Sequence, residues 1–175
     1  MIEIRKEKKE DYGQIRMVNN RAFGQHGEGR IVNKIRRSCR EIVSLVAALD
    51  DKIVGHIFFS PAIIKIPTGI ITGVIKGMGL APMAVLPEFQ NKGIGSMLVT
   101  EGLEKIKYAK YPFVIVLGHK KYYPRFGFQR GLEFGLRSQW HWVPDEAFMA
   151  MILDESVMKD ISGIVKYRDE FNEAM

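Results

Sequence analysis

The hydrophobic pattern of the first third of the chain predicts a strand, two helices and a hairpin. Apolar and charged positions alternate over residues 2–5, which indicates a short strand. Apolar positions then recur at helical spacing over residues 8–23 and again over residues 28–37. The hydrophobic pattern becomes strand-like over residues 42–49 and 53–60. The Asp-Asp-Lys turn between these two segments predicts a hairpin.

The middle of the chain predicts a second hairpin followed by a strand, a helix and another strand. Residues 63–66 and 70–75 flank Pro67-Thr68-Gly69, a strong turn signal. A glycine-rich apolar stretch over residues 77–87 continues as a strand, and a helix is expected over residues 94–108. The short, wholly apolar run 113–117 indicates a strand that is buried on both faces and parallel to the strand before the helix.

These elements predict an α/β fold with a mixed, mostly antiparallel central sheet. The sheet should contain one parallel strand–helix–strand step with a right-handed crossover, and helices should flank it. A late strand is expected over residues 148–153, whereas the tail 154–175 shows only weak patterning. With 175 residues and no internal repeat or linker, the chain is expected to form a single domain, residues 1–175.

Composition narrows the classes of protein to which the chain could belong. A hydrophobic fraction of 46% excludes a disordered chain, and no apolar run reaches the ~18 residues of a membrane span. The charged N-terminus does not resemble a signal peptide, and one cysteine, Cys39, cannot form an internal disulfide. We therefore expect a cytoplasmic protein. The net charge of +6 favours an anionic partner, but it does not distinguish nucleic acid, a membrane surface and a phosphorylated small molecule.

The stretch 77–97 has the local organisation of an anion-binding site. An apolar strand leads into a glycine-containing turn, and a helix begins after the turn, so free backbone N–H groups and the helix dipole converge there. Pro82 lies within this strand and cannot donate a ladder hydrogen bond, so the strand should be bulged or unpaired at that point. A ligand with a pyrophosphate at one end and an amide-bearing arm at the other would suit both features.

Three better-known motifs are absent from the sequence. No Gly-Lys-Ser/Thr occurs, which excludes the P-loop, and the dinucleotide fingerprint fails at its third glycine at both Gly77-Met78-Gly79 and Gly93-Ile94-Gly95. One cysteine and four scattered histidines offer no zinc-binding spacing, so no metal is expected.

The remaining pattern, Gln90-x-x-Gly93-x-Gly95, resembles the acetyl-CoA signature [QR]-x-x-G-x-[GA] of the GNAT superfamily of N-acyltransferases. The apolar segment 80–87 before it supports the resemblance. So does Tyr123-Pro-Arg-Phe-Gly127-Phe128 after the next strand, which is similar to the family's Tyr-x-x-x-Gly-Phe element. The resemblance covers residues 2–128, and residues 129–175 would add C-terminal strands and the tail.

The resemblance implies a set of residues that bind the co-substrate. The main chain of Met83, Ala84 and Val85 would pair with the pantetheine arm. The pyrophosphate would lie at the turn, formed by Gln90, Asn91, Lys92, Gly93, Ile94, Gly95 and Ser96. The resemblance suggests two further contacts to the cofactor, His119 and Phe126. His119 lies near the position where many relatives carry an asparagine.

The resemblance also implies roles in catalysis. Tyr123 would protonate the departing thiolate, since a free phenol titrates near ~10 and still holds its proton at neutral pH. Tyr122 is the rival for this role. The general base is open between Glu28 and His56. His56 shares a strand face with Val54 and Phe58, which favours a buried structural histidine.

The resemblance therefore implies an enzyme that moves an acetyl group from acetyl-CoA to a primary amine, by direct attack in a ternary complex. The acceptor is open among small molecules and peptides, and a homodimer is also left open. The main alternative is a non-catalytic acyl-CoA-binding module that regulates a partner. Binding to nucleic acid would need clustered basic residues with interleaved aromatics, but the basic residues here are dispersed.

Overall fold

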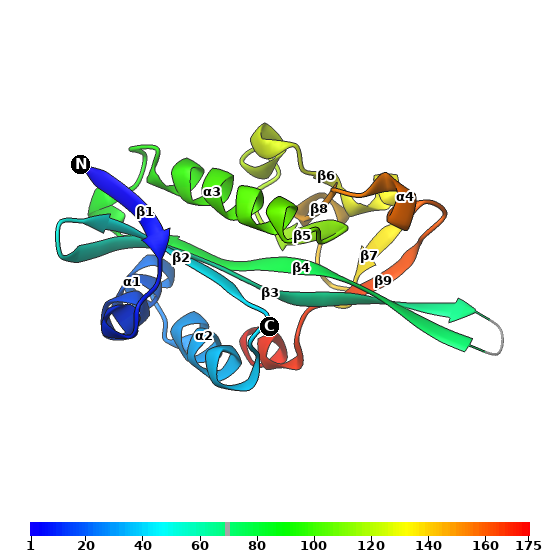
Figure 1. The fold of residues 1–175 in the computed structure, drawn as a ribbon, viewed down its shortest axis with the longest axis horizontal. Coiled ribbons are helices and arrows are strands. Elements are labelled where there is room, and N and C mark those ends of the chain that lie inside the picture. The colour runs from blue at the N-terminus through cyan, green and yellow to red at the C-terminus, as the bar shows by residue number, and fades with distance from the viewer. Residues whose placement is uncertain (69–70) are drawn as a thin grey trace. The chain divides into compact units, whose positions relative to one another are not determined.

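The computed structural model describes residues 1–68 and 71–175, which form a mixed α/β fold with mostly antiparallel strands, as predicted (Figure 1). Its longer helices are α1 (Tyr12–Phe23), α2 (Gly27–Ser38) and α3 (Ile94–Tyr108). Its strands are β1 (Ile2–Lys6), β2 (Val43–Leu49), β3 (Lys52–Thr68), β4 (Ile71–Val85), β5 (Phe113–Leu117), β6 (Gln129–Arg130), β7 (Leu136–Ser138), β8 (Phe148–Ile152) and β9 (Gly163–Lys166). The short helical segments are η1 (Lys9–Asp11), η2 (Pro87–Phe89), η3 (Tyr123–Phe126), η4 (Gly131–Phe134), η5 (Asp145–Ala147), α4 (Glu155–Met158) and η6 (Asp169–Ala174).

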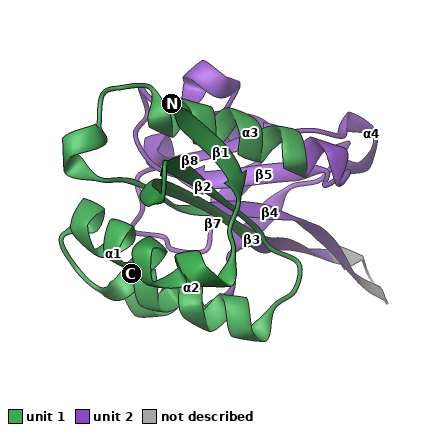
Figure 2. Cartoon of the chain, turned by 60° about the vertical axis from the view of Figure 1, so that its left-hand side comes forward, with its two compact units in different colours: residues 1–60, 81–105, 169–175 green, residues 61–80, 106–168 purple. Residues whose placement is uncertain are grey.

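The chain divides into two compact units, each assembled from separate stretches of sequence (Figure 2). Unit 1 contains residues 1–60, 81–105 and 169–175, and unit 2 contains residues 61–80 and 106–168. In the described residues, no helix is long and apolar enough to cross a membrane.

Unit 1 is built on three antiparallel strands, with β2 between β1 and β3. The helices α1 and α3 cover opposite faces of these strands. Asn19 of α1 hydrogen-bonds to His56, whereas a Cβ on the adjacent Gly55 would lie 3.0 Å from Leu98 of α3. Successive residues of a strand point to opposite faces, so each helix buries its apolar stripe against its own side.

The helices of unit 1 lie close to where the sequence predicts, except that α1 begins at Tyr12 rather than Lys8, because residues Lys9–Asp11 form the separate segment η1. Gly24 ends α1 in the left-handed conformation (φ 68°), which glycine adopts without a steric penalty because it has no Cβ. The amphipathic pattern of α2 buries Ile31, Val32 and Ile35. The C-terminal η6 lies against this helix, where the side chain of Glu173 pairs with Lys34 at 2.7 Å.

Unit 2 contains the predicted parallel step. Met78, Gly79 and Leu80 of β4 pair in parallel with Val114, Ile115 and Val116 of β5. Strand β8 is antiparallel to both of its neighbours, β5 on one edge and β6 on the other. Strand β9 pairs antiparallel with β3 and parallel with β7, which adds a second parallel pair that the sequence did not predict.

Several predicted boundaries need correction. Residues 53–60 and 63–66 were expected as two strands but belong to the single strand β3, which continues through Pro61 to Thr68. Pro67 and Thr68 therefore extend a strand rather than form the turn, and Gly69 and Ile70 lie outside the described residues. The glycine-rich strand ends at Val85, because Pro87 begins η2.

Candidate active site

The turn after β4 exposes the backbone donors that the sequence predicts. Asn91 and Gly93 both have positive φ angles, 59° and 81°, which bend the chain sharply before α3. The first backbone bond of the helix runs from the Met97 N–H to the Gly93 carbonyl, at 3.0 Å. The N–H groups at the start of α3, those of residues 94–96, therefore have no acceptor within the helix, and the helix dipole adds positive potential there. Such a turn can bind an anion.

Two side chains, one within η2 and one directly after it, hold this turn in place. The Gln90 side-chain amide donates to the Val85 carbonyl at 3.0 Å, so Gln90 ties the turn to the last residue of β4. Arg21 of α1 makes two hydrogen bonds to Glu88, at 2.9 and 3.0 Å. The turn is thus fixed to both a strand and a helix of unit 1.

Lys92 supplies a cation at the exposed side of the turn. Its Nζ atom lies 5.3 Å from the centroid of the Phe89 ring, and Lys52 approaches the same ring at 5.1 Å. Contacts of this length are favourable cation–π interactions. They place both ammonium groups beside the turn. Lys52 also lies 3.9 Å from the Glu88 carboxylate, which partly neutralises its charge, so Lys92 contributes more of the positive potential near the α3 N-terminus.

The last residues of β4 are separated from its ladder with β5. Within the described residues, the parallel register ends at Leu80, and the cis peptide Ala81–Pro82 follows. Met83 is half-buried, whereas Ala84 and Val85 are buried. These three residues were predicted to act through their main chain, a role that does not depend on the exposure of their side chains.

Unit 2 places Tyr123 at the carboxyl end of β5. Its ring packs directly on Gly118, where no side chain could fit, and its edge meets the Phe128 ring at 5.7 Å. The residue is 7% exposed. Burial raises the pKa of the Tyr123 phenol, with a smaller contribution from Tyr122, so the hydroxyl stays protonated at neutral pH.

The neighbours of Tyr123 differ in exposure and contacts. Tyr122 is half-buried and lies under the Arg125 guanidinium, 4.3 Å from its ring centroid. Phe126 is half-buried against Tyr122 at 5.3 Å. His119 has an exposed side chain, but its carbonyl accepts the N–H groups of Tyr122 (3.0 Å) and Tyr123 (3.4 Å). In this structure His119 therefore shapes the turn that carries the tyrosines.

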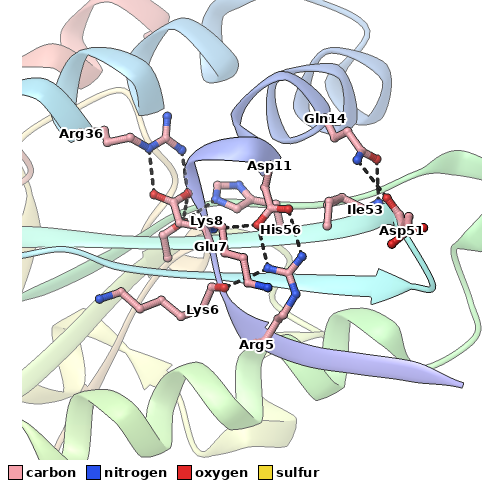
Figure 3. Close-up of polar contacts among 11 residues, drawn as sticks. Arg5, Lys6, Glu7, Lys8, Asp11, Gln14, Arg36, Asp51, Ile53 and His56 are labelled. Atoms are coloured by element: carbon pink, nitrogen blue, oxygen red, sulfur yellow. Dashed lines mark hydrogen bonds and ion pairs between the residues drawn. The ribbon is translucent and has the colours of Figure 1, made fainter.

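His56 belongs to a buried polar chain in unit 1 (Figure 3). Its Nε2 atom lies 2.9 Å from the Ser44 hydroxyl, and its Nδ1 atom lies 3.1 Å from the Asn19 amide. Ser44 donates to Glu7 at 2.6 Å, and Glu7 accepts two hydrogen bonds from Arg36 at 2.7 and 2.8 Å. Burial lowers the pKa of His56 to about 3. A fully engaged imidazole of this pKa is a poor base, so we place His56 in the core.

Glu28 is the predicted base that unit 1 supplies. It lies in the first turn of α2, and its Oε1 atom accepts a hydrogen bond from Gln25 at 2.8 Å. In the part of the chain that the structure describes, its Oε2 atom is buried and has no hydrogen-bond partner. Leaving a buried acceptor unpaired costs about 1–3 kcal/mol, so this oxygen is suited to receive a donor from a ligand.

Sequence reasoning missed Tyr167, which follows β9 and is buried. Its hydroxyl lies 3.4 Å from the Leu80 carbonyl and 3.5 Å from the Ile115 carbonyl, so it reaches the β4–β5 pair. The flanking Lys166 and Arg168 gave this segment the character of a charged tail, and its only signal was an isolated aromatic residue.

The predicted site residues thus divide between the two units. Unit 1 holds the end of β4, the turn and Glu28, and unit 2 holds His119, Phe126 and both tyrosines. A sequence model described as the acetyltransferase (GNAT) domain matches residues 3–131. The chain belongs to the GNAT acetyltransferase family. Its mixed sheet with a parallel β4–β5 pair agrees with this assignment.

Relatives with both similar sequence and similar fold are known for this GNAT chain. The uncharacterized N-acetyltransferase YjhQ of Escherichia coli is 40% identical over 123 residues, a match that covers 69% of this chain and 66% of the relative. The crystal structure of YhbS from Escherichia coli in complex with CoA is 29% identical with a TM-score of 0.87, covering 98% of this chain and 92% of that one. A GNAT acetyltransferase from Brucella melitensis in complex with acetyl-CoA is 33% identical with a TM-score of 0.76, and 98% of each chain is covered.

Proposed function

We propose that this chain is an acetyl-CoA-dependent N-acetyltransferase that acetylates a primary amine by direct transfer in a ternary complex. The observation that carries the proposal is the turn between Gln90 and Ser96, after which the first N–H groups of α3 have no acceptor within the helix. Two related structures, of YhbS and of the Brucella melitensis protein, were determined with CoA and acetyl-CoA. Family membership and the turn together support the same co-substrate here.

In this proposal, acetyl-CoA binds to unit 1 along the end of β4 and the turn. The pyrophosphate accepts hydrogen bonds from the N–H groups at the start of α3, and Lys92 adds a positive charge. The pantetheine amides pair with the main chain of Met83, Ala84 and Val85. Gln90 aligns the two subsites, since its side chain already joins the turn to the Val85 carbonyl at 3.0 Å. His119 and Phe126 are proposed as further contacts to the co-substrate.

The proposed reaction transfers one acetyl group and moves two protons. The lone pair of the neutral amine attacks the thioester carbonyl, a C–N bond forms, and the C–S bond breaks. Tyr123 donates its phenolic proton to the departing sulfur. Glu28 takes the proton that the nitrogen loses, through the oxygen that has no partner within the described chain.

The raised pKa of Tyr123 has two consequences for this role. Burial keeps the phenol protonated, so the proton is available at neutral pH. The same burial makes the phenol a weaker acid than a free thiol, whose pKa is near ~8.5. Transfer to sulfur is therefore favourable only if the thiolate forms in an equally desolvated environment, which raises its own proton affinity.

Direct transfer is preferred over a covalent acyl-enzyme. The only cysteine, Cys39, follows α2, and its Sγ atom lies 3.9 Å from the Glu41 carbonyl. In the described residues no histidine or carboxylate is bonded to this thiol, whereas a nucleophilic cysteine needs such an activating partner.

An assay of CoA release with purified protein, acetyl-CoA and a panel of amines tests this function. The panel should include small amines, amino acids and peptides with free N-termini, and calorimetry should measure CoA binding in parallel. Release of CoA that depends on one class of amine supports the proposal. CoA binding without release on any amine would favour the alternative, a non-catalytic acyl-CoA-binding regulator, and absence of CoA binding would refute both.

A further inference from the structure

An acidic side chain lies next to the turn that is proposed to bind the pyrophosphate. Glu88 belongs to η2, which ends directly before Gln90, the first residue of that turn. Hydrogen bonds from its own backbone N–H and from Arg21 lower the pKa of the Glu88 carboxyl, so the group is ionised at neutral pH. A negative charge at this place opposes the binding of a phosphate, so its presence needs an explanation.

Arg21 of α1 gives this carboxylate a fixed direction. Its Nη1 and Nη2 atoms donate to the two carboxylate oxygens of Glu88, at 2.9 and 3.0 Å. A guanidinium that binds both oxygens of a carboxylate fixes the orientation of both groups. Lys52 adds a looser contact, with its Nζ atom 3.9 Å from the same carboxylate. The charge of Glu88 is therefore compensated by two cations of unit 1.

The Arg21–Glu88 pair is suited to supply geometry rather than stability. The two side chains are 47% and 43% exposed. Water and salt screen exposed ion pairs, and their measured effects on unfolding are small. The pair nevertheless connects α1 to the segment that leads from β4 into the turn.

Other bonds hold the same segment to the sheet. The Leu86 N–H donates to the Val54 carbonyl at 2.9 Å, and the Gln90 side chain donates to the Val85 carbonyl at 3.0 Å. Both bonds lead back to strands, whereas the bond of Glu88 leads to α1. Loss of Glu88 should therefore free the helix side of the segment while its strand side stays attached.

We propose that Glu88 and Arg21 are positioning residues for the co-substrate, and that their bond holds η2 and the turn in the arrangement that binds the pyrophosphate. The inference rests on the proposed function, since it needs a ligand that carries a pyrophosphate. Charge alone predicts that loss of Glu88 strengthens CoA binding, because a negative charge disappears from beside the site. Loss of the connection to α1 predicts the opposite.

Calorimetric titration with CoA distinguishes these two outcomes. We expect Glu88→Ala to raise the Kd for CoA by about three- to fivefold, the range that one exposed bidentate pair can supply. Glu88→Gln keeps one acceptor for Arg21 and should lie between Glu88→Ala and wild type. Glu101→Ala removes an exposed acid of α3 and should bind CoA as tightly as wild type or more tightly. A Kd for Glu88→Ala equal to or below that of wild type would overturn the inference.

Arg21→Ala and the double variant show whether the two residues act together. Arg21→Ala should weaken CoA binding at least as much as Glu88→Ala, because it also leaves the Glu88 charge without its bidentate partner. The loss in the double variant should be smaller than the product of the two single losses. Arg16→Ala changes an exposed arginine of the same helix and should stay within about twofold of wild type. Losses that multiply would overturn the inference.

Two further measurements separate positioning from stability. Urea unfolding of Glu88→Ala should give the wild-type midpoint, because the pair is exposed. With a reactive amine, Glu88→Ala should raise the KM for acetyl-CoA and keep kcat within about twofold of wild type. A fall in kcat at unchanged KM, or a loss of stability large enough to explain the weaker binding, would overturn the inference. A wild-type protein that binds no CoA would refute the proposed function instead.

Discussion

The Nε2 atom of His56 lies 2.9 Å from the Oγ atom of Ser44, and this contact determines which ring nitrogen carries the proton. The single hydroxyl proton of Ser44 is donated to Glu7 at 2.6 Å, so the hydroxyl oxygen must accept from the ring. His56 is therefore protonated at Nε2, and Nδ1 accepts from the Asn19 amide at 3.1 Å. Every donor in this part of the core has an acceptor only while the imidazole is neutral.

This arrangement predicts that His56 makes stability fall in mild acid. Its pKa is lowered to about 3 in the folded protein from the ordinary 6.5, so the unfolded chain binds more protons between these values. The contribution of His56 is complete above about pH 6.5 and declines as the pH falls, by about 2 kcal/mol at pH 5. Urea unfolding at pH 7 and pH 5 should show this loss in wild type, and a smaller one in His56→Gln.

The matched control for His56 is His26→Gln, since His26 is exposed. The stability of His26→Gln should depend on pH as that of wild type does. His56→Gln should be less stable than wild type at pH 7, so the two are compared by how much stability each loses between pH 7 and pH 5. Equal slopes in His56→Gln and wild type would show that the imidazole is not held neutral in the core. Glu7 adds a loss of the same sign at lower pH. Burial alone would raise its pKa, but hydrogen bonds from Arg36 and Ser44 outweigh burial and lower it.

Tyr123→Phe should separate catalysis from binding. Loss of the general acid should lower kcat by about 10²- to 10⁴-fold while the affinity for CoA stays close to wild type. Tyr122→Phe is the matched variant, and it should retain most of the activity if Tyr123 is the acid. Because burial raises the Tyr123 pKa above its usual value near ~10, kcat should show no descending limb from this group up to about pH 10. The reverse ranking of the two variants would assign the role to Tyr122.

Lys92→Ala should weaken CoA binding through charge alone. Lys92 stands beside the turn, with its Nζ atom 5.3 Å from the Phe89 ring, and its loss should raise the Kd for CoA by about three- to tenfold at low salt. The difference should shrink as salt is added, because the contact is exposed. Lys105→Ala changes an exposed lysine farther along α3 and should leave the Kd unchanged. A similar loss in both variants would indicate a general effect of net charge.

Glu28→Gln tests the proposed base. The amide keeps the shape of the side chain but cannot take a proton, so kcat at neutral pH should fall by about 10²- to 10⁴-fold once the reactive amine is known. Glu101→Gln, an exposed acid of α3, is the control and should retain full activity. If kcat is unchanged and only the KM for the amine rises, Glu28 binds the acceptor without deprotonating it.

Much of the fold could be predicted because the informative patterns are local. The change from period two to helical spacing located α3 and β5, and the wholly apolar run from Phe113 to Leu117 gave the correct parallel pairing with β4. Placing His56 on one face with Val54 and Phe58 correctly indicated a buried residue. The glycine turn correctly indicated where α3 starts. The first backbone N–H groups of any helix have no acceptor within the helix, so these donors could be predicted without the structure.

The remaining features depend on contacts between distant residues. The bonds of Tyr167 reach Leu80 and Ile115, which lie 87 and 52 positions away, so no local pattern could reveal them. Likewise, the hydrogen-bond partners of His56 lie on α1 and β2, and the Glu7–Arg36 ion pair extends this series of buried polar contacts. The pattern predicts two strands, over residues 53–60 and 63–66, but β3 continues through Pro61 between them.

Two glycines of β4 offer a matched test of the packing around Tyr167. A Cβ at Gly79 would overlap the Tyr167 ring, whereas a Cβ at Gly73 would meet no atom of the described residues within 4 Å. Gly79→Ala must therefore push the ring away from the ladder, and overpacking of this kind typically costs about 1–3 kcal/mol. Gly73→Ala should be nearly neutral or slightly stabilising, since alanine restricts the unfolded chain more than glycine does.

Urea unfolding of the two alanine variants and of wild type checks this pair. Gly79→Ala should unfold at a lower urea concentration than wild type, because the added Cβ displaces the Tyr167 ring from its place against Gly79. Equal stabilities of the two alanine variants would mean that the Tyr167 ring moves aside at no cost in free energy.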